Sequence, residues 1–308
     1  MKYCTLCKIN LIEKGSWCKL CCKEYLKRYR MFHRNHIKNL NQKWRNNNHN
    51  YTKQYLFDRY CSADGRMVQL NRYARRRAKR KNLKYDLTID FLQQLWKLQN
   101  GLCAVTKLPL ILSKEKGQQK PLPFGPSIDR INPKIGYVKG NVRLVCYISN
   151  CCLHDFGIEI FHCIANAYIH NVIEIPVYQV ASNFRLSEKQ QNNKRYRETK
   201  KGTITSLFNE SKKRSKNTNI PFSLTKSEID NMLIECNGSC ALTNIPFDLH
   251  FYSTYTSNPF RPSIDRIDTN KGYVKENVRL VCIAVNYALN EFGEQVFRQV
   301  CDAYFATK

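Results

Sequence analysis

The amino-acid sequence predicts an α+β protein in which a cysteine-rich segment and a long basic helix precede two tandem strand–strand–helix units with flanking helices. Three observations lead to this prediction. Two pairs of cysteines lie near the N-terminus, a stretch rich in Lys and Arg follows them, and a segment of roughly 100 residues occurs twice.

The N-terminal cysteines have the spacing of a metal site. Cys4-x2-Cys7 and Cys18-x2-Cys21 form two pairs separated by ten residues, and four thiolates suit tetrahedral zinc. The alternatives are that Cys22 replaces Cys21 as a ligand, or that these are scattered core cysteines. We expect structural Zn²⁺ on Cys4, Cys7, Cys18 and Cys21, because four thiolates leave no open position for water.

The basic stretch after the cysteines predicts a polyanionic partner. The chain has 51 Lys and Arg against 24 Asp and Glu, and residues 1–81 hold 22 of these cations and 4 of the acids. From Lys23 to Lys81 aromatic residues alternate with cations and proline is absent, which predicts a long exposed helix. A solvated helical face is the simpler interpretation, but the aromatic residues favour contact with phosphates. We expect residues 1–65 to form a zinc knuckle and basic arm that binds double-stranded DNA.

The internal repeat sets the domain organisation. Residues 99–157 contain GPSIDRINPKIGYVKGNVRLVC, and residues 236–293 contain RPSIDRIDTNKGYVKENVRLVC. We define the first copy as residues 66–180 and the second copy as residues 202–308. Residues 181–201 are polar and without apolar periodicity, so they predict a connector, either an exposed linker or a charged helix.

Each copy predicts the same order of elements. In the first copy a helix begins near Thr88 and ends at Asn100, where Asn-Gly is typical of a helix end. Two strand-like runs follow at 127–131 and 141–145, separated by a turn that contains glycine. The apolar periodicity from Tyr147 to about Tyr168 predicts a longer helix.

A carboxylate and an amide recur at the same spacing in both copies. Asp129 lies in the first strand and Asn150 near the start of the following helix, 21 residues later, and Asp265 and Asn286 repeat this spacing. A strand–strand–helix turn brings such residues together. Their oxygens predict a site for a hard divalent cation, Mg²⁺ or Mn²⁺ rather than zinc.

At these residues the sequence resembles the HNH, or ββα-metal, endonuclease family, and the resemblance covers both copies. It implies tandem ββα-metal units and metal-dependent hydrolysis of DNA phosphodiester bonds. It also implies that Asn141 and Asn277 occupy the family's middle Asn position. The catalytic residues that the resemblance assigns are Asp129, Arg130, Asn141, Asn150, Asp265, Arg266, Asn277 and Asn286.

The sequence departs from the family at the general base. Arg130 and Arg266 stand where the family has histidine, and a guanidinium cannot accept a proton near neutral pH. Some restriction enzymes of the family look similar in having Asp-Arg here, with another residue as the base. Tyr137 and Tyr273 are weak candidates, since a tyrosine after glycine in a turn more often serves packing.

Two histidines differ between the copies. His154 aligns with Asn290, and His250 aligns with Ser113, so neither belongs to a mechanism that both copies share. If one copy alone is active, His154 or His250 marks it. Otherwise each is a structural or surface residue.

Four further cysteines resemble the remains of zinc knuckles. Cys103 and Cys146 in the first copy, and Cys240 and Cys282 in the second, have each lost the second cysteine of a pair. Two thiols are too few for a structural zinc. We expect these four cysteines to be buried and free of metal.

The functional expectation is a DNA endonuclease of restriction or homing type, and the composition is compatible with a phage or viral origin. The two covalently joined sites and their different loops suggest a monomer that acts as a pseudo-dimer on an asymmetric target. One alternative is a non-catalytic DNA-binding protein on a degenerate scaffold, and another is that one copy serves only docking.

The sequence also indicates a compartment. The N-terminus lacks the apolar segment of a signal peptide, and there is no apolar run of about 18 residues that would cross a membrane. The 15 cysteines are odd in number and partly arranged as metal ligands. We expect a soluble, intracellular protein with reduced thiols.

Overall fold

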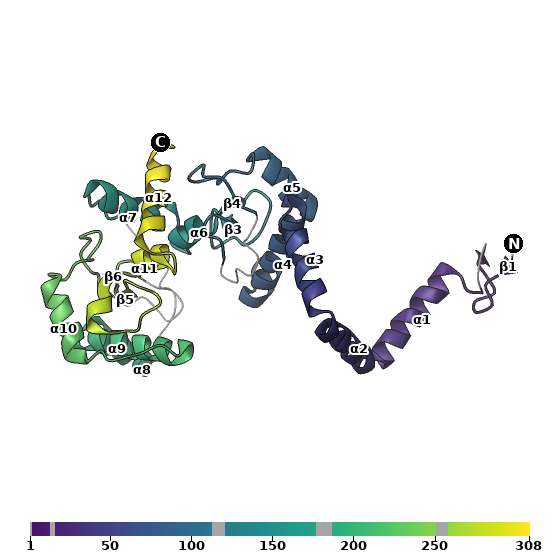
Figure 1. Cartoon of the computed structure of the whole chain (residues 1–308), viewed down its shortest axis with the longest axis horizontal. Coiled ribbons are helices and arrows are strands. Elements are labelled where there is room, and N and C mark those ends of the chain that lie inside the picture. Colours follow the sequence, from purple (N-terminus) through teal and green to yellow (C-terminus); the bar gives the residue numbers. More distant parts are fainter. Residues whose placement is uncertain (1, 13–15, 113–120, 177–186, 251–257) are drawn as a thin grey trace. The chain divides into compact units, whose positions relative to one another are not determined.

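The structure, a computed structural model, describes residues 2–12, 16–112, 121–176, 187–250 and 258–308. The chain divides into two compact units, Met1–Arg59 and Tyr60–Lys308, which we call the N-terminal unit and the C-terminal unit (Figure 1). Both copies of the repeat lie in the C-terminal unit. Within the described ranges, every helix is too short or too polar to cross a membrane.

The N-terminal unit consists of a small hairpin and consecutive basic helices. Its elements are β1 (Lys2–Tyr3), β2 (Leu11–Ile12), α1 (Lys19–Phe32), α2 (Arg34–Asn47) and α3 (His49–Tyr60). The strands pair antiparallel, and α1 and α2 have no buried residues. The prediction of a single long helix is therefore wrong, because this stretch forms several consecutive helices. The helices change at His33 and Asn48, and the Asn48 amide donates a hydrogen bond to the Trp44 carbonyl at 2.9 Å, which closes the end of α2.

Helix α4 (Ala63–Lys81) is the first helix of the C-terminal unit. Ser62 caps it, because its hydroxyl accepts a hydrogen bond from the Gly65 backbone N–H. One face is buried at Met67, Leu70, Ala74 and Ala78, and the other faces carry the cations. The domain boundary expected after residue 65 therefore falls inside α4.

The predicted order of strand, turn, strand and helix is confirmed in both copies. The first copy contains β3 (Pro126–Arg130), β4 (Val142–Cys146) and α6 (Tyr147–Leu153), and the second copy contains β5 (Pro262–Arg266), β6 (Val278–Cys282) and α11 (Ile283–Leu289). Each strand pair is antiparallel. Its register places Asp129 opposite Arg143, and Asp265 opposite Arg279.

The long helix expected from Tyr147 to about Tyr168 is wrong, because two helices occupy this stretch. Helix α6 ends at Leu153, and α7 (Ile158–His170) follows. His154 has φ +46° and Gly157 has φ +90°, and a right-handed helix cannot continue through such residues. In the second copy Asn290 and Gly293 have positive φ at the equivalent place.

The remaining helices flank the two strand pairs. They are α5 (Ile89–Leu98), α8 (Glu188–Glu198), α9 (Lys200–Thr218), α10 (Lys226–Glu235), the 3₁₀ turn η1 (Lys275–Asn277) and α12 (Gly293–Phe305). Helix α8 begins with a capping box between Ser187 and Gln190. The described part of the connector is therefore the charged helix of the two alternatives, and residues 181–186 lie outside the described residues.

One hydrophobic cluster spans both copies, and a second cluster lies within the second copy. Ile148 and Phe161 of the first copy belong to the same buried cluster as Val285 and Phe297 of the second. The rings of Phe161 and Tyr304 lie with centroids 4.9 Å apart across the two copies. The copies therefore pack against each other within a single compact unit, in which each strand pair keeps its own site.

Candidate functional site

The four predicted zinc ligands lie together in the N-terminal unit. The sulfur atoms of Cys4, Cys7, Cys18 and Cys21 all lie within 4.8 Å of one another. Burial alone would raise the pKa of Cys4, but backbone N–H groups of Cys7 and Cys18 lower that pKa to about 6. The cluster can hold a metal such as zinc. Cys22 is exposed and outside it, so the structure favours Cys21 over Cys22.

In the C-terminal unit, each predicted Asp is buried beside an arginine. Asp129 is 4% exposed, and Arg143 Nε donates to its Oδ2 at 2.8 Å. Asp265 is 6% exposed, and Arg279 Nε donates to its Oδ2 at 2.9 Å. Burial raises the pKa of both Asp carboxyl groups, and the arginines offset this only in part. A cation at either carboxylate would favour its ionised form.

The predicted Asn ligands are fixed by their amide nitrogens. Asn150 Nδ2 donates to Ser127 Oγ at 2.7 Å and to the Ile128 carbonyl at 3.3 Å. Because a carbonyl oxygen can only accept, these bonds also fix which way the amide points. Asn286 repeats both bonds, to Ser263 Oγ at 2.7 Å and the Ile264 carbonyl at 3.1 Å. The amide oxygens are therefore turned away from the strands.

The serines that hold these amides were not predicted from the sequence. Ser127 and Ser263 stand two residues before Asp129 and Asp265 in the repeated SIDRI segment. Side chains two apart on a strand lie on the same face. Their repetition at this spacing is the signal that could have identified them.

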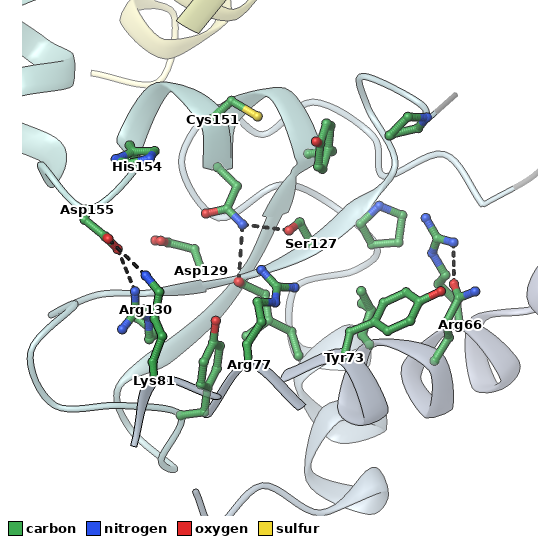
Figure 2. Close-up of a pocket in the computed structure, with 18 residues that line it drawn as sticks. Arg66, Tyr73, Arg77, Lys81, Ser127, Asp129, Arg130, Cys151, His154 and Asp155 are labelled. Atoms are coloured by element: carbon green, nitrogen blue, oxygen red, sulfur yellow. Dashed lines mark hydrogen bonds and ion pairs between the residues drawn. The ribbon is translucent and has the colours of Figure 1, made fainter. Parts of the chain in front are cut away.

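A pocket of about 470 Å³ joins the predicted residues of the first copy (Figure 2). Asp129 and Asn150 line it together with Arg130 and Tyr137, as the sequence predicts for one site. His154 lines the same pocket, and its ring stacks on Tyr287 of the second copy with centroids 4.2 Å apart. Burial lowers the pKa of His154.

Helix α4 forms the other side of this pocket, a position that was not predicted from the sequence. The lining residues Arg66, Tyr73, Arg77 and Lys81 all come from α4. Their spacing of seven, four and four residues puts them on one helical face. Figure 2 shows Arg77 and Lys81 extending from this helix toward the strand that carries Asp129. The sequence shows that these four residues share a helical face, but it does not show which part of the chain that face packs against.

Arg130 and Arg266 are held by hydrogen bonds at the ends of β3 and β5. Arg130 donates to the Pro133 carbonyl at 2.6 Å and to Asp155 Oδ1 at 2.7 Å. Its guanidinium lies 5.2 Å from the centre of the Tyr137 ring. In the second copy Arg266 donates to two loop carbonyls and lies 5.3 Å from the Tyr273 ring. These arginines order the turn between the strands.

Asn141 and Asn277 stabilise the loops between β3 and β4 and between β5 and β6. Asn141 is 7% exposed, its Nδ2 donates to the carbonyls of Asn132 and Gly136, and its Oδ1 accepts from the Asn132 N–H, all at 2.8–2.9 Å. Asn277 makes three equivalent bonds, at 2.9–3.0 Å, to Asp268 and Gly272. Asn141 lies outside the pocket lining. Its amide therefore acts on the backbone, at a place where the family resemblance assigns a catalytic residue.

The other singled-out residues have simpler environments. Tyr137 and Tyr273 are each 4% exposed. His250 is exposed beside Asp248, away from the pocket of the first copy. The predicted burial of four cysteines is confirmed, for Cys103, Cys146, Cys240 and Cys282.

Comparisons of the chain with known proteins found no relative. No protein-family model, no curated protein and no solved structure matches the chain. The site geometry and the chemistry of its residues are therefore the basis for a function.

Proposed function

We propose that the protein is a DNA endonuclease that hydrolyses phosphodiester bonds with a divalent cation, Mg²⁺ or Mn²⁺. The observation that carries this proposal is the pocket in which Asp129 and Asn150 face three cations of α4. Oxygen ligands suit a hard cation, and arginine and lysine side chains suit phosphate. One pocket thus offers both kinds of contact that phosphodiester hydrolysis needs.

Asp129 and Asn150 would hold the divalent cation. Both N–H groups of the Asn150 amide are directed at Ser127 and Ile128, and among the described residues none donates a hydrogen bond to its Oδ1. A carboxylate and an unengaged amide oxygen fit Mg²⁺ better than a softer metal. When bound there, the cation would stabilise negative charge on the leaving oxygen. Asp265 and Asn286 offer the same ligands in the second copy.

His154 is the best candidate to accept the proton from the attacking water. In hydrolysis the water oxygen bonds to phosphorus, the bond from phosphorus to the leaving sugar oxygen breaks, and that oxygen takes up a proton. His154 lines the pocket, and its lowered pKa keeps the imidazole neutral near neutral pH. Arg130 is already bonded to Asp155, and a guanidinium has no acceptor for a proton, so its role is positioning.

The N-terminal unit would supply affinity that depends little on base sequence. Helices α1 and α2 bury no residue, and exposed aromatic side chains such as Tyr25, Tyr29 and Trp44 lie among their cations. Cations of this kind neutralise backbone phosphates and release counter-ions. Zinc on the four cysteines would order the start of α1, since Cys18 caps that helix.

The second candidate is a DNA-binding protein without catalysis. It is favoured by the ion pairs of Asp129 with Arg143 and Asp265 with Arg279, which satisfy each carboxylate within the protein. In that case the two strand pairs serve only to maintain the fold, and the cations of α4 bind DNA without cleavage.

Plasmid nicking distinguishes the two functions. The full-length protein is incubated with varied supercoiled plasmid and genomic DNA, with Mg²⁺ or Mn²⁺, alongside the double variant Asp129→Asn/Asp265→Asn. Asp302→Asn is the matched control, because Asp302 is exposed and its one ion pair within the described residues is with Arg298 on its own helix. We expect metal-dependent cleavage by the wild type and the control, and none by the double variant. DNA binding without cleavage across substrates and salt conditions would establish the second candidate.

A further inference from the structure

Arg66 in the first copy is a partly buried cation at the edge of the pocket. Its Nη1 donates to Gln69 Oε1 at 2.6 Å, while its Nε is buried and has no hydrogen-bond partner. Within the described residues no carboxylate forms an ion pair with it. Burial lowers the pKa of this guanidinium, which reflects the cost of removing it from water. A desolvated cation at an open pocket is suited to an anionic ligand.

Arg77 lies on the same face of α4 as Arg66. It is half-buried, it lines the pocket, and it forms no hydrogen bond or ion pair with the part of the chain that the structure describes. Lys81, one turn further on, is already shared with Asp155 at 3.2 Å. Figure 2 shows Arg77 between Lys81 and Tyr73. Arg66 and Arg77 are therefore the two guanidinium groups left for a ligand.

The second copy has lost this arrangement on the equivalent helix. Helix α9 aligns with α4 through the matching ends NLKYDLT and NIPFSLT, which places Thr203 at the position of Arg66 and Arg214 at that of Arg77. Arg214 forms an ion pair with Glu210 at 3.5 Å. Glu210 itself stands at the position of Tyr73, and Thr218 at that of Lys81.

The arginine and the small residue at this place are exchanged between the copies. The first copy has Arg66 and Gly125, and the second copy has Thr203 and Arg261 at the equivalent positions. In the first copy a Cβ at Gly125 would lie 3.3 Å from Arg66 Nη2, so glycine leaves room for that guanidinium. In the second copy Arg261 stands at the Gly125 position and is 8% exposed. Its guanidinium donates to the Leu249 carbonyl and, at 3.2 Å, to the Arg197 carbonyl. The Arg261 guanidinium therefore already binds backbone oxygens of the protein.

We infer that Arg66 and Arg77 each contact a backbone phosphate of the DNA in the first copy, and that the second copy takes no phosphate at its equivalent positions. The inference rests on the proposed function and narrows it to an enzyme with one cutting site, which nicks a single strand. It stands against the pseudo-dimer expected from the sequence, in which both copies cut. The second copy then acts as a scaffold that buries the shared core.

The test compares equivalent arginines in the full-length protein. Arg77→Gln should lower the rate of plasmid nicking about 10- to 100-fold, because a charge-assisted hydrogen bond to phosphate is lost. Arg214→Gln is the matched control and should stay within about twofold of the wild type, since surface ion pairs contribute little. Arg77→Lys should recover part of the loss. Thermal unfolding of each variant shows whether the fold is retained.

A second measurement separates this inference from the proposed function. Binding of a short DNA duplex without divalent metal should weaken in Arg77→Gln, with the slope of log K against log salt reduced by about 1, and remain unchanged in Arg214→Gln. If the wild type cuts no DNA but the two variants differ in this way, the nuclease proposal fails and the phosphate site stands. Equal effects of the two variants on binding, or double-strand breaks made in one encounter, would overturn the inference.

Discussion

Replacing Asn141 by alanine removes the side chain that closes the loop between β3 and β4. Three hydrogen bonds to the backbone of Asn132 and Gly136 are lost. Each such bond contributes about 1 kcal/mol net, and the Asn132 groups can turn to water because that residue is exposed. We therefore expect Asn141→Ala to lower the free energy of unfolding by about 2–3 kcal/mol, mainly through the buried Gly136 carbonyl left unpaired.

Thermal or urea unfolding of the C-terminal unit measures this effect, with an expected fall in Tm of roughly 4–10 °C. Asn277→Ala should cost about the same, since Asn277 makes three equivalent bonds. Asn270→Ala is the control, because Asn270 is exposed and its side chain should contribute less than about 0.5 kcal/mol. Full stability of Asn141→Ala together with complete loss of cleavage would refute the reasoning, because the amide would then act on the substrate.

Three other predictions concern the metal cluster, the arm and the base. Purified protein should hold about one Zn²⁺, which Cys18→Ser removes and Cys22→Ser retains, as measured by metal analysis; equal loss in both variants would contradict the ligand set. Deleting residues 1–59 should weaken DNA binding broadly and flatten its salt dependence while the C-terminal unit stays folded, whereas an unchanged slope would assign the arm to another partner. His154→Gln should lower the cleavage rate by about 100-fold or more with DNA affinity unchanged, and full activity would remove His154 as the base.

The features that the sequence determined are those set by neighbouring residues. The capping box of Thr225 and Glu228 forms as local hydrogen bonds, and Asn100 has the positive φ expected at a helix end. The two strand pairs follow from short apolar runs that a glycine turn separates. Duplication strengthened these predictions, because the same pattern occurs twice in one chain.

Packing between distant segments decided the rest. The sequence contains the cations of α4, but only the contact of this helix with β3 places Arg66 and Arg77 in a pocket with Asp129. The two copies of the repeat are visible in the sequence. Only the structure shows that Arg261 lies beside Thr203 and donates hydrogen bonds to backbone carbonyls. Spacing along a chain fixes which residues share a helical or strand face, whereas the partner of that face depends on how the whole core fills its volume.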